Sequence, residues 1–188
     1  LSEHEKGLER MRQNIDAWWP AIEAGAEAII MTASGCGAMV QDYGHLLKDD
    51  PVYAAKAQKV SELCTDLGAF LLKQDLEKLK VRQDPGKVAF HCPCTLQHAM
   101  KQNGVVEQVL TRAGVNLAAT KDKHLCCGSA GTYSVTQPEM SQKLLGNKLK
   151  ALTVDNPDRI VTANIGCQMH LETKSPVPVQ HWIELLDQ

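Results

Sequence analysis

The stretch RIVTANIGCQMH, residues 159–170, contains the pattern that decides the fold. After Arg159 it runs through the apolar and β-branched residues of a buried strand, and it ends on a Gly-Cys pair followed by Gln, Met and His. Cys167 and His170 stand three positions apart, so in the first turn of a helix their side chains face the same side. A helix N-terminus also favours the thiolate, which is the form of cysteine that binds metals. The stretch therefore predicts a strand followed by a helix start that carries metal ligands.

A second stretch, AIIMTASGCGAM at residues 28–39, repeats this order. Both stretches run through Thr-Ala to Gly-Cys, and each follows a predicted helix that contains an asparagine, Asn14 or Asn147. The echo predicts a tandem duplication. Because the sequence opens without Met and directly in a helical pattern, we expect that the first copy lacks its front half and that the chain is a piece of a longer protein.

Short apolar segments alternate with amphipathic segments along the chain. Strands are predicted at residues 26–34, 88–92, 116–120 and 159–164. Helices are predicted at residues 3–24, 51–73, 103–114, 138–152 and 179–188. This alternation predicts an α/β fold with a mainly parallel sheet covered by helices on both faces. In such sheets, binding sites form at the carboxyl ends of the strands.

The segment KVRQDPGK, residues 80–87, carries the turn signals Pro85 and Gly86 and is the best candidate for an internal boundary. We predict the C-terminal half of a first repeat over residues 1–80 and a complete second repeat over residues 81–188. We expect the two to pack as one compact unit with one sheet, because an unpaired strand between apolar helices would leave much apolar surface in contact with water.

Charge and hydropathy exclude several classes of partner. The net charge is −2 with both signs interspersed, so no basic patch indicates a nucleic-acid partner or a membrane surface. No stretch approaches the roughly 20 apolar residues of a membrane-spanning helix, and the N-terminus LSEHEKGLER does not resemble a signal peptide. We therefore expect a cytoplasmic protein without a membrane span, whose partners are small molecules or other proteins.

The 7 cysteines indicate the chemistry. An odd number without an export signal argues against a disulfide framework and favours reduced thiols, metal ligation or redox chemistry. Most of them lie in four loop-like segments at the ends of predicted elements: residues 34–37, 91–94, 126–128 and 166–170. Cys64 instead lies on the apolar stripe of a predicted helix and is interpreted as a core residue. His91, His98 and His124 are expected to cap, to form hydrogen bonds or to face solvent rather than to bind metal.

The neighbouring Cys126 and Cys127 limit the kind of metal site. Two adjacent thiolates cannot easily chelate one tetrahedral ion, and a disulfide between them would be strained. An iron–sulfur cluster presents several iron atoms, so each sulfur could bind a different one. Gly128 would allow close approach of the backbone, whose amides could donate hydrogen bonds to cluster sulfurs. Cys92 and Cys94 are two apart in extended chain, so either or both could point toward the same site.

The segments HCPCTLQH, HLCCGSAGTY and TANIGCQMHLE resemble the second cysteine-rich, or CCG, domain of bacterial glycolate oxidase iron–sulfur subunits. The segment NIDAWWPAIEAGAEAIIMTASGCGAM, residues 14–39, is similar to the end of the first CCG repeat of that family. The wider family includes lactate-utilisation proteins and a heterodisulfide reductase subunit whose paired CCG repeats bind iron–sulfur clusters. The resemblance covers essentially the whole chain.

This resemblance implies a Rossmann-like CCG domain that holds an iron–sulfur cluster, which we expect to be of the 4Fe–4S type. The family's motif cysteines fall on Cys94, Cys126, Cys127 and Cys167, followed in the central motif by Gly128. The family pattern ends in C-x-x-C, whereas His170 stands at its last position here, and the first copy has Met39 there. Completion of the site would therefore fall to Cys92, Cys36 or His170.

The resemblance further implies an electron-transfer role without catalytic residues in this chain. A flavin subunit containing FAD would oxidise glycolate to glyoxylate, and this chain would relay the electrons toward membrane quinone, attached peripherally through the complex. The fragment alone should not turn over glycolate. Three alternatives stay open: a zinc-binding structural or assembly module, the equivalent subunit of a lactate-oxidising complex, and a thiol–disulfide enzyme that uses Cys126 and Cys127. The last is disfavoured because ordinary dithiol catalysts have C-x-x-C spacing.

Overall fold

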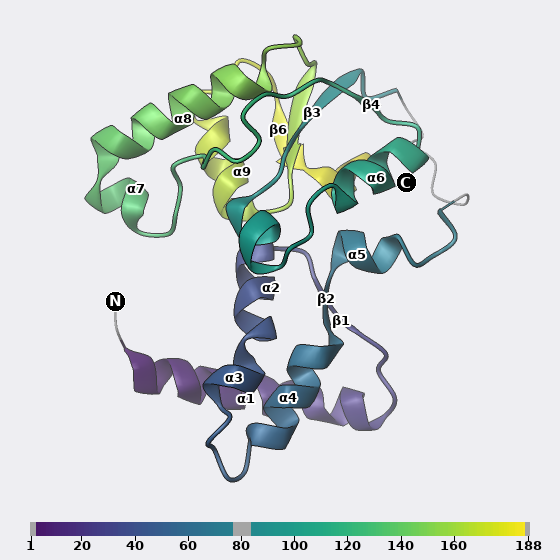
Figure 1. Ribbon diagram of the computed structural model, residues 1–188, viewed down its shortest axis with the longest axis vertical. Helices are drawn as coiled ribbons and strands as arrows, with labels where there is room; N and C mark the ends of the chain where they lie inside the picture. The colour runs from purple at the N-terminus through teal and green to yellow at the C-terminus, as the bar shows by residue number, and fades with distance from the viewer. Residues whose placement is uncertain (1–2, 77–83, 187–188) are drawn as a thin grey trace.

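The chain folds into two parallel sheets flanked by helices (Figure 1). This computed structural model describes residues 3–76 and 84–186. The larger sheet has the strand order β4-β3-β5-β6, all parallel. Its strands are β3 (Lys87–His91), β4 (Asn116–Leu117), β5 (Arg159–Thr162) and β6 (Val179–His181). The predicted α/β class with parallel strands is confirmed.

Helices cover both faces of the larger sheet. On one face, Val88 and Phe90 of β3 pack in an apolar cluster with α6 (Val105–Arg112). On the other face, Ala89 of β3 and Ile160 of β5 pack with α8 (Pro138–Leu152) and α9 (Ile165–Glu172). Shorter turns complete the connections: η2 (Thr95–Ala99), a π-helical turn after β3, and α7 (Tyr133–Thr136), before α8. Since side chains alternate along a strand, the face that holds Ala89 also receives His91 at the end of β3.

The N-terminal part forms a separate small sheet, with β1 (Ile29–Met31) parallel to β2 (Cys64–Asp66). An apolar cluster centred on Ile15 and Val60 joins four helices. These are α1 (His4–Glu23), α2 (Ser34–Gln41), α3 (Tyr43–Leu46) and α4 (Ala54–Leu63). Figure 1 shows α1, α3 and α4 at the lower end of the molecule and α2 rising from them toward the larger sheet.

The prediction of one helix over residues 51–73 is wrong for its middle part. The chain instead forms α4, then β2, then α5 (Leu67–Leu71), which begins where the Asp66 side chain accepts a hydrogen bond from the Gly68 amide. An apolar stripe cannot distinguish these alternatives, because pairing with β1 is a long-range contact that local periodicity does not contain. Cys64, predicted as a core residue, is indeed buried.

Two further expectations are corrected by the strand pairing. Among the described residues, β1 pairs with β2 rather than with the larger sheet, so the predicted shared sheet is wrong. The partner of β1 is β2, which was predicted as part of a helix. At the C-terminus, the predicted helix over residues 179–188 is replaced by β6 and a 3-10 turn, η3 (Trp182–Leu185). Pairing with β5 and burial of Trp182 hold this segment in place.

The predicted boundary near residue 80 lies partly in residues 77–83, which are outside the described residues, so the division into 1–80 and 81–188 stays a prediction. Hydrogen bonds join the two parts where α2 and α9 begin. The Ser34 amide donates to the Ala163 carbonyl at 3.2 Å, and the Asn164 amide nitrogen donates to the Ser34 hydroxyl at 3.2 Å. The Ser34 hydroxyl also lies 2.7 Å from that of Thr95. The two helix starts therefore lie side by side.

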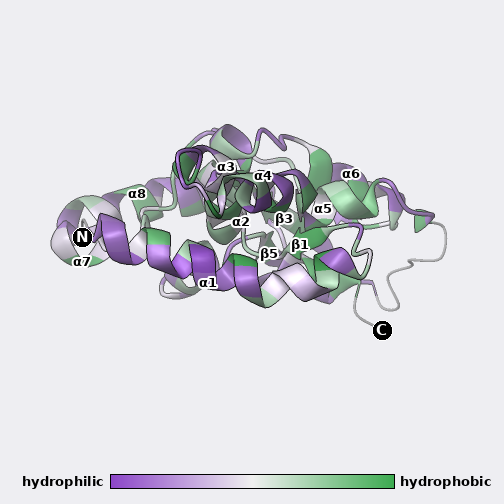
Figure 2. Ribbon diagram, turned by 90° about the horizontal axis from the view of Figure 1, so that it is seen from below, coloured by the Kyte–Doolittle hydropathy of each residue, from purple (hydrophilic) through white to green (hydrophobic). Residues whose placement is uncertain are grey.

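Within residues 3–76 and 84–186, no helix combines the length and the apolar character needed to cross a membrane. The longest helix, α1, has 20 residues, and Figure 2 shows hydrophilic and hydrophobic residues alternating along it. Its apolar residues Met11 and Ile15 are buried against the helices of the N-terminal part.

Candidate metal centre

Four cysteines from three loops meet near the carboxyl ends of β3 and β5. Cys94 immediately precedes η2, Cys126 and Cys127 lie in the loop between β4 and α7, and Cys167 lies in the first turn of α9. Hydrogen bonds join the Cys126 sulfur to Cys94 and to Cys127, and Cys127 to Cys167. We call this connected set the thiol network. The sequence predicted that these four side chains would meet, and the structure brings them together.

Protons are unequally shared within the thiol network. Hydrogen bonds from Cys127 and Cys94 stabilise the Cys126 thiolate and lower its pKa to about 2. A hydrogen bond from Cys127 likewise lowers the pKa of Cys167 to about 5. The same contacts raise the pKa of Cys94 and Cys127, which keep their protons, and the single Cys127 proton is shared between Cys126 and Cys167. The network therefore holds two thiolates beside two thiols, and a metal centre would compensate this negative charge.

Gly128 shapes the loop beside the thiol network. Its φ of +92° is in the left-handed region, and an added Cβ would overlap the carbonyl oxygen of Ser141 in α8. Its amide donates a hydrogen bond to the Cys126 sulfur at 3.3 Å, and its carbonyl accepts one from the Ser141 hydroxyl at 2.8 Å. The glycine thus lets α8 approach the loop while the backbone amide stabilises the thiolate.

His91 is the site residue that sequence reasoning missed. It is 1% exposed, and its ring nitrogens and the sulfurs of Cys127 and Cys167 include a set of three atoms within 4.8 Å of one another. The imidazole contributes to the low pKa of Cys167, yet neither ring nitrogen has a hydrogen-bond partner of normal geometry. His91 therefore does not cap a helix and does not face solvent, although the sequence led us to expect such roles. The available signal was its position directly after the apolar run of residues 88–90, at the carboxyl end of β3.

Residues 88–172, which contain His91 and the whole thiol network, match the family of cysteine-rich domains named CCG. After this match we call residues 88–172 the CCG domain. The match ends at the last residue of α9 and begins at the second residue of β3, so it covers the larger sheet except for β6.

Curated relatives extend the similarity beyond the CCG domain. The whole chain is 59% identical to the glycolate oxidase iron-sulfur subunit of Escherichia coli strain K12, of which it spans 46%. It is 33% identical, over 90% of its own length, to a probable glycolate oxidase iron-sulfur subunit of Bacillus subtilis strain 168, of which it spans 38%. Lactate utilization protein A of Geobacillus thermodenitrificans is 24% identical over 95% of the chain and 75% of that protein. The chain thus spans less than half the length of the first two relatives.

Three further predicted residues lie outside the thiol network. Cys92 is buried in the apolar cluster beside α6, and burial raises its pKa to about 12, so it stays protonated. Cys36 is exposed in the first turn of α2, and none of the hydrogen bonds of the described residues joins it to the network. His170 is directed to another partner, since its Nε2 lies 3.2 Å from the Ser141 hydroxyl. Their roles as completing ligands stay predictions.

Lys148 of α8 places a positive charge inside the CCG domain. It is 1% exposed, and its ammonium donates hydrogen bonds to the carbonyls of Asp122 at 3.4 Å and Lys123 at 3.0 Å. Burial lowers its pKa, while attraction to the nearby cysteines, Cys127 foremost, opposes that shift. Gln97 also donates to the Lys123 carbonyl, at 3.0 Å. The loop before Cys126 is therefore held from two sides, and the buried cation suits an anionic group among the thiols.

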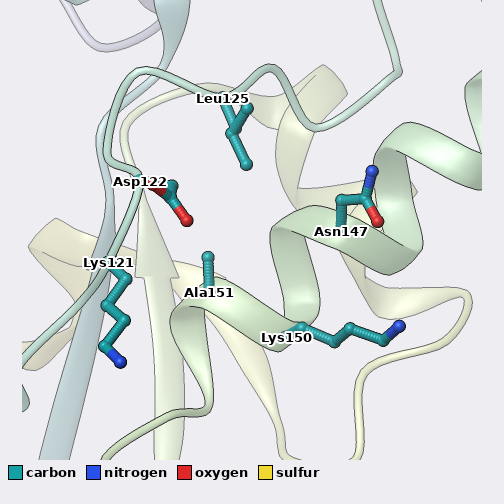
Figure 3. A pocket seen from close by; sticks show the side chains of 6 residues that line it. All are labelled: Lys121, Asp122, Leu125, Asn147, Lys150 and Ala151. Atoms are coloured by element: carbon teal, nitrogen blue, oxygen red, sulfur yellow. The ribbon is translucent and has the colours of Figure 1, made fainter.

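A surface pocket of about 310 Å³ lies on the outer side of this loop (Figure 3). Its lining comes from the loop and from α8: Lys121, Asp122, Leu125, Asn147, Lys150 and Ala151. Figure 3 shows Leu125 and Ala151 on facing sides and the ammonium groups of Lys121 and Lys150 pointing away from the centre. No cysteine lines this pocket, so it is distinct from the metal centre.

Proposed function

We propose that this chain holds an iron–sulfur cluster and passes electrons within a glycolate-oxidising complex. The observation that carries the proposal is the meeting of four thiols from three loops in a CCG domain. The name of the Escherichia coli relative, an iron-sulfur subunit of glycolate oxidase, supports the same assignment. The ligands would be Cys94, Cys126, Cys127 and Cys167.

The residues present fit such a cluster on three counts. The adjacent Cys126 and Cys127 suit a group with several metal atoms better than a single ion. The Gly128 amide already donates to the Cys126 sulfur, and hydrogen bonds of this kind orient the ligands in metal sites. Lys148 supplies a buried positive charge close to the thiols. A bound cluster would supply one-electron transfer, and these side chains would hold it and set its reduction potential.

We assign the oxidation of the substrate to partner chains. A flavin subunit containing FAD would take electrons from glycolate, and this chain would pass them toward quinone in a complex peripheral to the membrane. The lactate utilization relative supports the equivalent role in a lactate-oxidising complex as the alternative. The two differ in the partner's substrate and not in the chemistry of the thiol network.

The decisive experiment is anaerobic purification of the chain, followed by iron and acid-labile sulfide analysis and electron paramagnetic resonance. We expect iron and sulfide together, with visible absorption and a signal that develops on reduction. Mixing with chemically reduced FAD should generate the same signal, because the flavin would then act as the electron donor. Zinc at one equivalent without sulfide would contradict the proposal, as would a cluster that reduced FAD leaves oxidised.

A zinc-binding structural module is the second candidate, and one observation favours it. His91, Cys127 and Cys167 offer three ligand atoms within 4.8 Å of one another, which suits a mixed zinc site completed by a fourth thiolate. Such a protein would be colourless and redox-silent. The same metal analysis distinguishes the two candidates, because zinc sites contain no labile sulfide.

A further inference from the structure

We infer that His91 is a ligand of the cofactor, so that the centre combines cysteine and histidine ligation. This inference rests on the proposed function. It assigns a role to a residue that lies outside the four motif cysteines, and three independent observations support it: unpaired burial, position and the neighbouring hydroxyl.

The first observation is burial without a partner. His91 is 1% exposed, and among the described residues neither ring nitrogen has a hydrogen bond of normal geometry, although the ring interacts with the Cys167 thiolate. A buried polar group that loses water and gains nothing costs about 1–3 kcal/mol, so native structures satisfy nearly all of them. A bond from one ring nitrogen to a metal removes this penalty.

The second observation is position. His91 ends β3 on the face that carries Ala89, and Ala89 packs in the same apolar cluster as Cys127 and Cys167. The three ligand atoms lie within 4.8 Å of one another. A ring nitrogen of His91 and the two sulfurs are thus close enough to bind one cluster, each to its own iron atom.

The third observation is Thr162, the neighbour of His91 across the sheet. The two residues are register partners in the parallel pair β3–β5, and therefore their side chains lie on the same face. The Thr162 hydroxyl is also fully buried and without a hydrogen-bond partner. Metal-binding histidines donate their other ring N–H to a second group, and we assign that role to this hydroxyl on the same face of the sheet. Thr162 is then a positioning residue for His91.

His170 is the competing histidine, because it stands where the CCG pattern has its final cysteine. Its Nε2 lies 3.2 Å from the Ser141 hydroxyl, and the side chain is only partly buried. His91 is instead fully buried and directed to two sulfurs of the thiol network. The His91 imidazole would thus supply the ligand that is lacking because His170 stands at the position of the final cysteine.

The test uses the anaerobically prepared chain with its cluster, in unlabelled form and with ¹⁵N-labelled histidine. Pulsed electron paramagnetic resonance of the reduced cluster should reveal the strong coupling of a directly bound nitrogen, and the label should change it. His91→Ala should abolish that coupling and lower bound iron at least twofold. His170→Ala and His98→Ala, a control at an exposed histidine, should keep the coupling.

A second variant separates ligation from packing. His91→Cys should retain the cluster without nitrogen coupling and shift its reduction potential to more negative values, since imidazole ligands raise the potential relative to thiolates. Thr162→Val should keep the nitrogen coupling and shift the potential slightly to more positive values, because a ring that no longer donates to an acceptor is a weaker electron donor to the metal. Circular dichroism checks that each variant is folded.

The outcomes distinguish this inference from the proposed function. A wild-type cluster with no histidine coupling, or with only the weak coupling of a hydrogen-bonded nitrogen, overturns the role of His91 as a ligand. Coupling that disappears in His170→Ala overturns it as well. Absence of iron and sulfide in the wild-type chain is instead a failure of the proposed function, and it is detected before any spectrum is recorded.

Discussion

The two strand-to-helix junctions of this chain share a local sequence but differ in what surrounds them. Both lead from a strand into a helix whose first turn carries Gly-Cys: β1 into α2 at Cys36, and β5 into α9 at Cys167. Cys167 is 7% exposed and joins three other cysteines, whereas Cys36 is exposed outside the thiol network. The local motif therefore presents a cysteine, and loops from elsewhere in the chain make it part of a site.

The helices that precede the two junctions also differ in the contacts of one corresponding residue. The residue after the shared asparagine is Ile15 in α1 and Lys148 in α8, and both are almost completely buried. Ile15 packs in an apolar core, while Lys148 anchors the loop that carries Cys126 and Cys127. One copy thus has a core residue where the other has a buried charge beside its thiols.

The largest effect should come from removing one cysteine at each junction. Cys167→Ser should weaken cofactor binding at least about tenfold, because it removes a ligand from the thiol network. Cys36→Ser should leave the iron and sulfide content of this chain unchanged. Metal and sulfide analysis of both variants, prepared side by side, measures the difference. Equal losses in the two variants would contradict the assignment of the site to Cys167.

The next effect concerns the pH dependence of thiol reactivity in metal-free protein. Because the pKa of Cys126 is lowered to about 2, its thiolate is already formed at pH 5, and alkylation by iodoacetamide should change little up to pH 8. Glutathione in the same buffers should react about tenfold faster for each pH unit below its thiol pKa. Mass spectrometry of labelled peptides measures the rates, in a Cys36→Ser background that removes the exposed cysteine outside the thiol network. A tenfold slope at Cys126 would disprove the stabilised thiolate.

Gly128→Ala tests the loop that carries Cys126 and Cys127 to the Cys167 junction. The added Cβ would overlap the Ser141 carbonyl, at a φ of +92° that alanine rarely adopts. We expect the free energy of unfolding to fall by about 3 kcal/mol. Gly166→Ala is the control, since its Cβ would make an ordinary contact 3.4 Å from the Ser129 hydroxyl and should cost less than about 1 kcal/mol. Urea unfolding of the metal-free variants gives both values, and equal values would argue against a special role for Gly128.

Lys148→Met tests the charge that distinguishes α8 from α1. Loss of a nearby cation destabilises the reduced, more negative cluster, and at roughly 1 kcal/mol the shift is on the order of 40 mV toward negative potentials. Lys150→Met, at an exposed position of the same helix, should shift the potential much less. A redox titration monitored by paramagnetic resonance compares them. Similar shifts in the two variants would show that burial of the lysine does not matter.

The smallest effect concerns the caps of the two helices. The Asn164 side chain accepts a hydrogen bond from the Gly166 amide at 3.0 Å at the start of α9, whereas Ala33 gives α2 no side-chain cap. Asn164→Ala should cost about 1 kcal/mol of unfolding free energy, and Ala33→Asn should add about 0.5 kcal/mol or more. Thermal unfolding of the metal-free variants measures both. A loss in Ala33→Asn would show that the two helix starts are not equivalent in geometry.

Prediction from sequence succeeded where the determining contacts are local. The helix at residues 138–152 was predicted with the bounds that the structure has, because Pro138 marks its start and its apolar stripe is regular. The four motif cysteines were expected to meet, since parallel strands place their carboxyl ends at one edge of the sheet. Prediction failed at β2 and β6, where short segments with helix-like patterns become strands through pairing with β1 and β5.

The roles of His91 and Lys148 depend on burial, which the sequence does not encode locally. His91 follows an apolar run that fits either face of a strand, and only the packing of α8 and α9 on one face places it beside Cys127 and Cys167. Lys148 looks like a surface residue of an amphipathic helix, yet its long side chain reaches two backbone carbonyls of a distant loop. Such contacts connect segments that are far apart in the chain.

The sequence by itself determined the alternation of strands and helices, the α/β class, and the cysteines presented at strand ends, because periodicity and turn residues act over a few neighbours. Only the tertiary structure decided which Gly-Cys junction joins a thiol network, which segments pair as strands, and which histidine and lysine lie buried beside the sulfurs. The physical reason is that pairing and burial are settled by contacts between distant segments, whose free energies can override local preference.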